Sequence, residues 1–100
     1  EYLVTRPLAR RPSHPGAVLD DILLDVKQSK TEIASLLGIS RQQLHDILAE
    51  RKPVSPQIAA RIGRLFGGGA GLWLRLQANH DAWLADRDEK LAAIRPLEVS

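Results

Sequence analysis

The segment from residue 29 to residue 52 limits the possible folds of this chain more than any other feature. It contains Ser-x-x-Glu at 29–32 and Ser-x-x-Gln at 40–43. These are two capping boxes, in which a serine oxygen accepts the amide of the third helical residue while that residue's side chain reaches back. Two helices are therefore expected to begin at residues 30 and 41. Gly38 lies between them and can adopt the left-handed backbone that ends a helix, so the segment predicts a helix-turn-helix.

Apolar side chains recur at helical spacing in both halves of this segment, as expected of two helices that share a core. The predicted buried faces are Ile33, Leu36 and Leu37 in the first helix, and Leu44, Ile47 and Leu48 in the second. Ala34 lies where the two helices would cross, and its small side chain allows the close approach that a short turn requires.

The opposite face of the second helix is polar. It carries Gln42, His45 and Asp46, flanked by Arg41 and Gln43. In the major groove arginine pairs with guanine and glutamine with adenine, so this helix is predicted to read base edges. Asp46 has the wrong charge for DNA, and three interpretations of it are open. The first is that Asp46 accepts a hydrogen bond from cytosine, and the second is that it holds Arg41 or Lys30 in place. The third is that it is an ordinary solvated helix residue.

Composition narrows the class of protein. A chain of 100 residues suffices for one domain with a modest core, and a hydrophobic share of 44% argues against disorder throughout. The formal net charge is only +2, so binding to nucleic acid must rest on local charge. There is no cysteine, which excludes disulfides and thiolate metal sites. No apolar run approaches the roughly 20 residues of a membrane span, and the N-terminus lacks an apolar signal core. We therefore expect a cytoplasmic protein with no membrane contact.

The segments on either side of the motif have distinct predicted roles. Residues 1–15 hold three arginines and three prolines and are expected to form an extended basic arm. That arm is either a solvated tail or a contact to DNA or a partner protein. A helix over about residues 17–26 follows, and its acidic outer face should lie away from DNA because phosphate would repel it. A Ser-Pro pair at 55–56 begins a further helix, and the glycine run at 67–69 ends it. Gly63, within that helix, is expected to permit a close contact with another helix.

A loop with two cations follows the second helix of the motif. Arg51 and Lys52 lie where the chain would pass the phosphate backbone, although a solvated surface pair is the alternative. The candidate DNA-contacting residues are Lys30, Thr31, Ser40, Arg41, Gln42, Gln43, His45, Asp46, Arg51 and Lys52.

A last helix is predicted over about residues 70–94, and its first half is apolar on more than one side. Its tryptophans either cap the core of their own subunit or belong to a dimer interface. The candidate interface residues are Leu72, Trp73, Leu76, His80 and Trp83. The expected organisation is thus an arm at 1–15 and a DNA-binding domain at 16–95, with the helix-turn-helix at 29–50 and a dimerisation helix at its end.

Catalytic and metal sites are not indicated. His14, His45 and His80 lie far apart in the sequence and lack the i, i+4 spacing of a helical metal site. The glycine run follows a helix and lacks the lysine and the serine or threonine of a phosphate-binding loop. Ser40 is explained more simply as a cap than as a nucleophile. Because no set of titratable groups converges on one site, we expect neither an enzyme nor a cofactor.

Several segments together resemble the short HigA-type antitoxins of bacterial toxin-antitoxin modules, within the Cro/C1-like (XRE-family) helix-turn-helix class. They are HPGAVLDDILL before the motif, the motif itself, RKPVSPQIAARIGRLFG after it, and GLWLRLQANHD near the end. These segments follow one another at family-like spacing over residues 14–81. The helix-turn-helix is common to many regulators, whereas the opening HPG combined with the late WL-x-LQ is more specific.

The resemblance implies an all-α, five-helix, lambda repressor-like domain with a long C-terminal helix. It implies a homodimer that binds an inverted-repeat operator in its own promoter and neutralises a HigB-type ribonuclease toxin, a ribosome-associated mRNA endonuclease. It places phosphate contacts near Lys30 and Lys52, and base contacts near Arg41, Gln42 and His45. The chain departs from the family at Ala49-Glu50, where members often have asparagine-glycine. The alternative function is a free-standing or phage-type regulator with no toxin partner.

Overall fold

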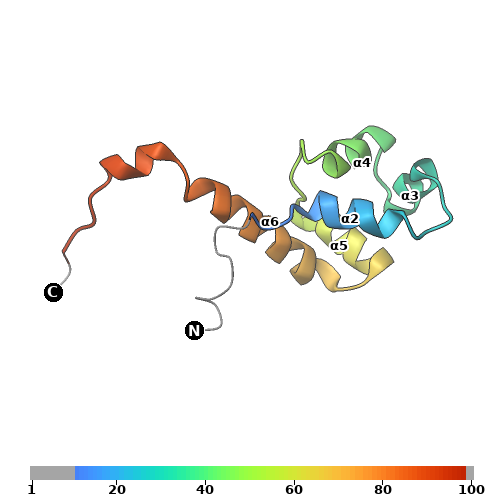
Figure 1. Cartoon of the computed structure of the whole chain (residues 1–100). Helices are drawn as coiled ribbons and strands as arrows, with labels where there is room; N and C mark the ends of the chain where they lie inside the picture. The colour runs from blue at the N-terminus through green and yellow to red at the C-terminus, as the bar shows by residue number, and fades with distance from the viewer. Residues whose placement is uncertain (1–10, 99–100) are drawn as a thin grey trace.

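The computed structural model describes residues 11–98, which form five α-helices, one 3-10 helix and no β-strand. The helices are α2 (Pro15–Leu23), α3 (Lys30–Leu37), α4 (Arg41–Leu48), α5 (Pro56–Phe66), α6 (Gly69–Ala85) and the 3-10 helix η1 (Glu89–Ala93). In Figure 1, α2 lies in the middle, with α4 above it, α3 beyond its right-hand end, and α5 and the start of α6 below it. The all-α prediction with five helices is confirmed. None of the helices in this part of the chain is long and apolar enough to cross a bilayer.

Both predicted capping boxes are formed. Ser29 Oγ accepts the Glu32 amide at 3.2 Å and Glu32 Oε1 accepts the Ser29 amide at 2.8 Å. The pair at 40–43 repeats this arrangement at 3.0 and 2.9 Å. Gly38 ends α3 with φ of 72°, in the left-handed region that glycine adopts without a Cβ clash. Local chemistry therefore sets both ends of the turn between α3 and α4.

A single core joins these helices. Its fully buried apolar members are Leu19, Ile33, Ala34, Leu37, Leu44, Ile47, Val54, Ala59, Ile62 and Trp73. The prediction for Leu36 is wrong, because 61% of this residue is exposed. Ile33, Ala34 and Leu37 form the buried stripe of α3, and Leu36 points roughly 100° away from its centre.

The HPG sequence begins α2. His14 is the N-cap: its Nδ1 accepts a hydrogen bond from the Gly16 amide at 2.8 Å. Pro15 occupies the first turn, where a backbone N–H would have no partner within the helix and its absence costs nothing. Gly16 touches the end of α4 so closely that a Cβ there would collide with the carbonyl oxygen of Ile47. The helix spans Pro15–Leu23 instead of the expected 17–26, because the amides of residues 24–26 bond three residues back and tighten its last turn.

This helix start corrects the boundary of the predicted arm. Pro15 belongs to α2, residues 11–14 precede it without regular structure, and residues 1–10 of the predicted arm lie outside the described residues.

A buried histidine pair joins this helix start to α6. The rings of His14 and His80 meet edge to face with centroids 5.0 Å apart. His80 Nδ1 lies 3.0 Å from the carbonyl oxygen of Pro12. Burial lowers the pKa of His14, and the nearby His80 lowers it further. His80 is therefore a packing residue inside the subunit, which corrects its assignment to the dimer interface.

Glycines bring α5 and α6 into close contact. Gly67, Gly68 and Gly69 all have positive φ and reverse the chain within three residues. A Cβ on Gly63 would collide with the backbone of Gly69, so the predicted close contact at Gly63 is confirmed. Trp73 then reaches back and donates from Nε1 to the Gly67 carbonyl oxygen at 3.0 Å. Trp73 is only 1% exposed, which corrects its assignment to a dimer interface and favours the interpretation of a core residue.

The long helix ends earlier than predicted. α6 stops at Ala85, and the Asp88 side chain caps η1 by accepting the Lys90 amide at 3.0 Å. Residues 85–90 hold no large apolar side chain, so a continued helix would have no stripe to pack. Leu91 and Ile94 are accordingly exposed, and residues after α6 extend away from the helical body (Figure 1).

Candidate nucleic-acid interface

The polar face of α4 is open to solvent. Arg41, Gln42 and His45 are exposed, while Leu44 and Ile47 on the opposite face are buried. Lys30, at the start of α3, lines the same concavity as these three polar residues. Its volume is about 310 Å³. The structure therefore brings the predicted phosphate contact of α3 beside the predicted base contacts of α4.

The remaining residues at the two helix starts have structural tasks of their own. Ser40 and Gln43 hold each other in the capping box, so Ser40 Oγ and Gln43 Oε1 are already engaged. Thr31 is exposed in the first turn of α3, next to Lys30. The helix start that carries Arg41 is thus held in a defined position by its own cap.

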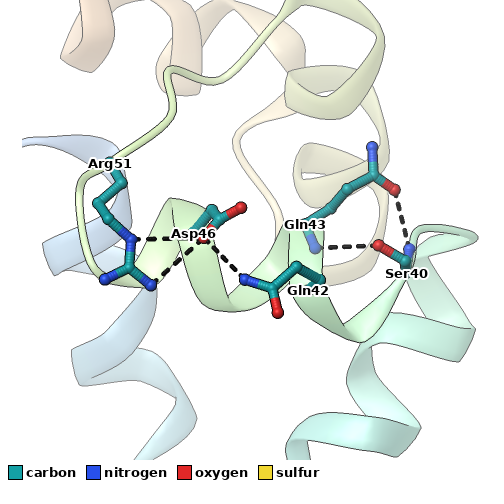
Figure 2. A network of polar contacts seen from close by, with 5 residues as sticks. All are labelled: Ser40, Gln42, Gln43, Asp46 and Arg51. Carbon is teal, nitrogen blue, oxygen red and sulfur yellow. Dashed lines mark hydrogen bonds and ion pairs between the residues drawn. The ribbon is translucent and has the colours of Figure 1, made fainter.

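Asp46 organises its neighbours on the α4 face, as Figure 2 shows. Its Oδ1 accepts from Gln42 Nε2 at 3.0 Å, from Arg51 Nε at 3.4 Å and from Arg51 Nη2 at 3.3 Å. The prediction that Asp46 holds Arg41 or Lys30 is wrong, since its partners are Gln42 and Arg51. A signal was present in the sequence, because glutamine and aspartate at i, i+4 on a helix are placed to hydrogen-bond.

The loop that carries Arg51 and Lys52 is held by α6. Gln77 is buried, and its Oε1 accepts the Val54 amide at 2.8 Å while its Nε2 donates to Asp81 Oδ1 at 3.0 Å. Val54 itself is inserted into the core. Sequence reasoning missed Gln77; the available signal was a single glutamine on the apolar stripe of the last helix, where a buried amide requires partners.

Arg61 connects the helix-turn-helix to α5. Its Nη1 donates to the carbonyl oxygens of Leu37 at 2.9 Å and Gly38 at 3.2 Å. These are carbonyls at the end of α3, which have no partner within the helix. The turn before α4 is therefore fixed from outside as well as by its own glycine.

Two helices joined by a glycine turn, the second with its polar face exposed, define a helix-turn-helix protein of the Cro/C1-like class. No protein-family model matches the chain. Virulence-associated protein I of Dichelobacter nodosus is 31% identical over 78 residues, which are 77% of this chain and 72% of that protein.

Solved structures narrow the assignment. An addiction module antidote protein of a HigA family from Coxiella burnetii is 30% identical, with a TM-score of 0.76 over 88% of this chain and 100% of that one. The Pseudomonas aeruginosa antitoxin HigA with the higBA promoter is 33% identical, with a TM-score of 0.75 over the same shares. The chain belongs to the HigA family of antitoxins.

Proposed function

We propose that this chain is an antitoxin and transcriptional autorepressor, which binds an inverted-repeat operator in its own promoter as a homodimer and neutralises a HigB-type mRNA endonuclease. The observation that carries the proposal is the exposed polar face of α4 beside Lys30. The Pseudomonas aeruginosa HigA was solved with the higBA promoter. The whole of that protein and 88% of this chain share the fold. The proposed role acts on DNA and on a toxin in the cytoplasm and requires no catalytic step.

Each part of the interface has a proposed task. Arg41, Gln42 and His45 read base edges from the major groove. Lys30, Arg51 and Lys52 contact phosphates and fix the register of the protein on the duplex. The domain that begins with α2 at Pro15 carries this interface, and the proposed arm precedes it. Thr31 and Gln43 lie in the first turns of the two helices, and Ser40 caps the second. The amides there that the capping boxes leave without a partner favour a phosphate.

The proposed dimer surface lies on α6. With Trp73 and His80 buried inside the subunit, the remaining candidates are Leu72, Leu76 and Trp83. Leu72 is 38% exposed, and Leu84, about three turns further along α6, is 44% exposed. Such large apolar side chains on one helix are consistent with a surface that a second subunit covers.

Binding assays on promoter and random duplexes test the DNA contacts. Arg41→Ala is expected to weaken promoter binding by about 1–3 kcal/mol per lost base contact and to leave toxin binding intact. Lys52→Ala serves as the matched control, because loss of a phosphate contact should weaken both duplexes equally and lower the salt slope by about one unit. Equal losses on both duplexes for Arg41→Ala would assign Arg41 to the backbone instead.

The alternative function is a free-standing regulator without a toxin. Co-expression separates the two: the reading frame beside this gene is induced with and without the chain, and growth is followed. Arrest that the chain relieves supports the antitoxin function. A neighbouring frame that is harmless, or whose toxicity the chain leaves unchanged, favours the free-standing regulator.

A further inference from the structure

The contact between Gln42 and Asp46 fixes which end of the glutamine amide faces outward. A carboxylate can only accept hydrogen bonds, so the group that lies 3.0 Å from Asp46 Oδ1 has to be the amide nitrogen of Gln42. The amide oxygen of Gln42 then points away from Asp46, as Figure 2 shows. Rotating the amide by half a turn would place oxygen against oxygen, which Asp46 prevents.

Arg51 makes this arrangement compatible with a DNA surface. Its guanidinium shares the same Oδ1, with Nη2 at 3.3 Å. The side chain of Asp46 is only 19% exposed, whereas that of Arg51 is 58% exposed. The negative charge is therefore largely covered by two neighbours, and the group left at the surface is a cation. Repulsion between Asp46 and phosphate is reduced accordingly.

We infer that Asp46 is a positioning residue that sets the base specificity of Gln42. With its oxygen outward, Gln42 accepts from a base that carries an exocyclic amine in the major groove, which means adenine or cytosine. Its nitrogen has two hydrogens, and the one that Asp46 does not engage is available to adenine N7. Adenine is therefore the preferred base. Guanine offers only acceptors at this edge, so it could accept only the one free N–H of Gln42, and its O6 would face the outward amide oxygen. A contact through both N–H groups of Gln42 would require the rotated amide. This inference rests on the proposed DNA-binding function.

Selection from a library of duplexes with a randomised central segment tests the inference without knowledge of the operator. Purified wild-type protein, Asp46→Asn and Asp46→Glu are each used to enrich duplexes, which are then sequenced. An asparagine offers Gln42 either an oxygen or a nitrogen and so permits both amide orientations. Asp46→Asn is expected to lower the adenine-over-guanine preference at one position of each half-site by about tenfold, within the range of a bidentate base contact.

Two further readouts separate positioning from other roles. Asp46→Asn should bind random duplex more tightly than wild type, because a negative charge is lost, while Asp46→Glu should retain part of the adenine preference. Arg51→Gln is the matched control. It should weaken all duplexes equally and leave the base preference unchanged, since phosphate contacts carry no sequence information.

The Gln42→Ala background decides whether Asp46 acts through Gln42. There, Asp46→Asn should no longer alter any base preference. A change that persists in that background would mean that Asp46 reads a base directly and would overturn the inference. An unchanged motif for Asp46→Asn in the wild-type background would also overturn it while leaving the proposed DNA binding intact. If the wild-type protein enriches no motif at all, both the inference and the proposed DNA-binding function fail.

Discussion

Gly16 occupies a position where the backbones of two helices meet. A Cβ there would lie 2.8 Å from the Ile47 carbonyl carbon and closer still to its oxygen, and neither atom can move without separating α2 from α4. Gly16→Ala is therefore expected to lower the free energy of unfolding by about 1–3 kcal/mol, as overpacking does in a tight core. Urea denaturation followed by circular dichroism measures this.

Gly71→Ala is the matched control, because a Cβ there meets only the flexible end of Arg75, at 3.1 Å. In a helix that substitution should stabilise by about 0.5–1 kcal/mol. If Gly16→Ala and Gly71→Ala changed the free energy of unfolding in the same direction, the steric explanation would be contradicted.

His14 gives the fold a dependence on pH. Its Nδ1 accepts the Gly16 amide, so protonation there would remove the N-cap of α2. The pKa of His14 in the folded chain is lowered overall, mainly by burial and then by His80. Glu50 and Asp81 act in the opposite direction and raise it, while Arg11 adds a small lowering. The unfolded chain binds this proton first, at pH about 6.5. Stability should consequently fall as pH drops below that value, by at most about 1.4 kcal/mol per pH unit for one proton, and level off below the folded-state pKa.

Unfolding curves between pH 7.5 and 5 for wild type and His14→Asn isolate this contribution, since asparagine also caps helices and does not titrate. The other two histidines are common to both proteins. Parallel stability profiles would mean that His14 is not the group responsible.

At the scale of helices, local chemistry predicted the starts better than the ends. The starts of α3, α4 and α5 depend on serines within three residues of the groups that they cap, and all three were predicted correctly. The outward direction of Leu36 was not predicted, and Trp73 was left between the core and a dimer interface, because the neighbour that covers a helix is decided by tertiary packing. The end of α6 at Ala85 depends likewise on where packing against the body stops.

For the candidate nucleic-acid interface, too, the sequence predicted what local spacing decides and missed what tertiary packing decides. The exposed face of α4 follows from its apolar spacing, so Gln42 and His45 were placed correctly on the surface. The bond from Gln77 to the Val54 amide spans 23 residues, and no local pattern indicates it. The contact between Asp46 and Arg51 likewise required the loop after α4 to fold back.

Glu50, two residues after the end of α4, has a strained backbone conformation. Its φ is 63°, in the left-handed region that disfavours residues with a Cβ. HigA-family members often have glycine at this place. Glu50→Gly should therefore raise the free energy of unfolding by about 0.5–1 kcal/mol, once the greater freedom of glycine in the unfolded chain is subtracted. Glu50→Ala removes the same charge but keeps the Cβ and should show no such gain. Equal stabilisation by both substitutions would attribute the effect to charge.

For the whole molecule, the proposed assembly depends on the apolar surface of α6. If a second subunit covers Leu72, introducing a charge there should prevent dimerisation because the carboxylate would be buried without a partner. Leu72→Glu is expected to sediment as a monomer at micromolar concentration, where wild type is expected to be a dimer. Leu97→Glu is the matched control, since Leu97 is 88% exposed and lies beyond α6.

The same change has a consequence on DNA. A two-fold dimer contacts half-sites about one helical turn, roughly 34 Å, apart, and joining two binding events raises affinity by about 10²–10⁴. On a duplex with both half-sites, Leu72→Glu should lose this rise in affinity. On a duplex with a single half-site, it should bind as tightly as wild type. Inserting five base pairs between the half-sites should impose the same loss on wild type, because one half-site then faces away. Wild-type affinity that is indifferent to the insertion would show that subunits bind independently, and the dimer surface would have to be sought elsewhere.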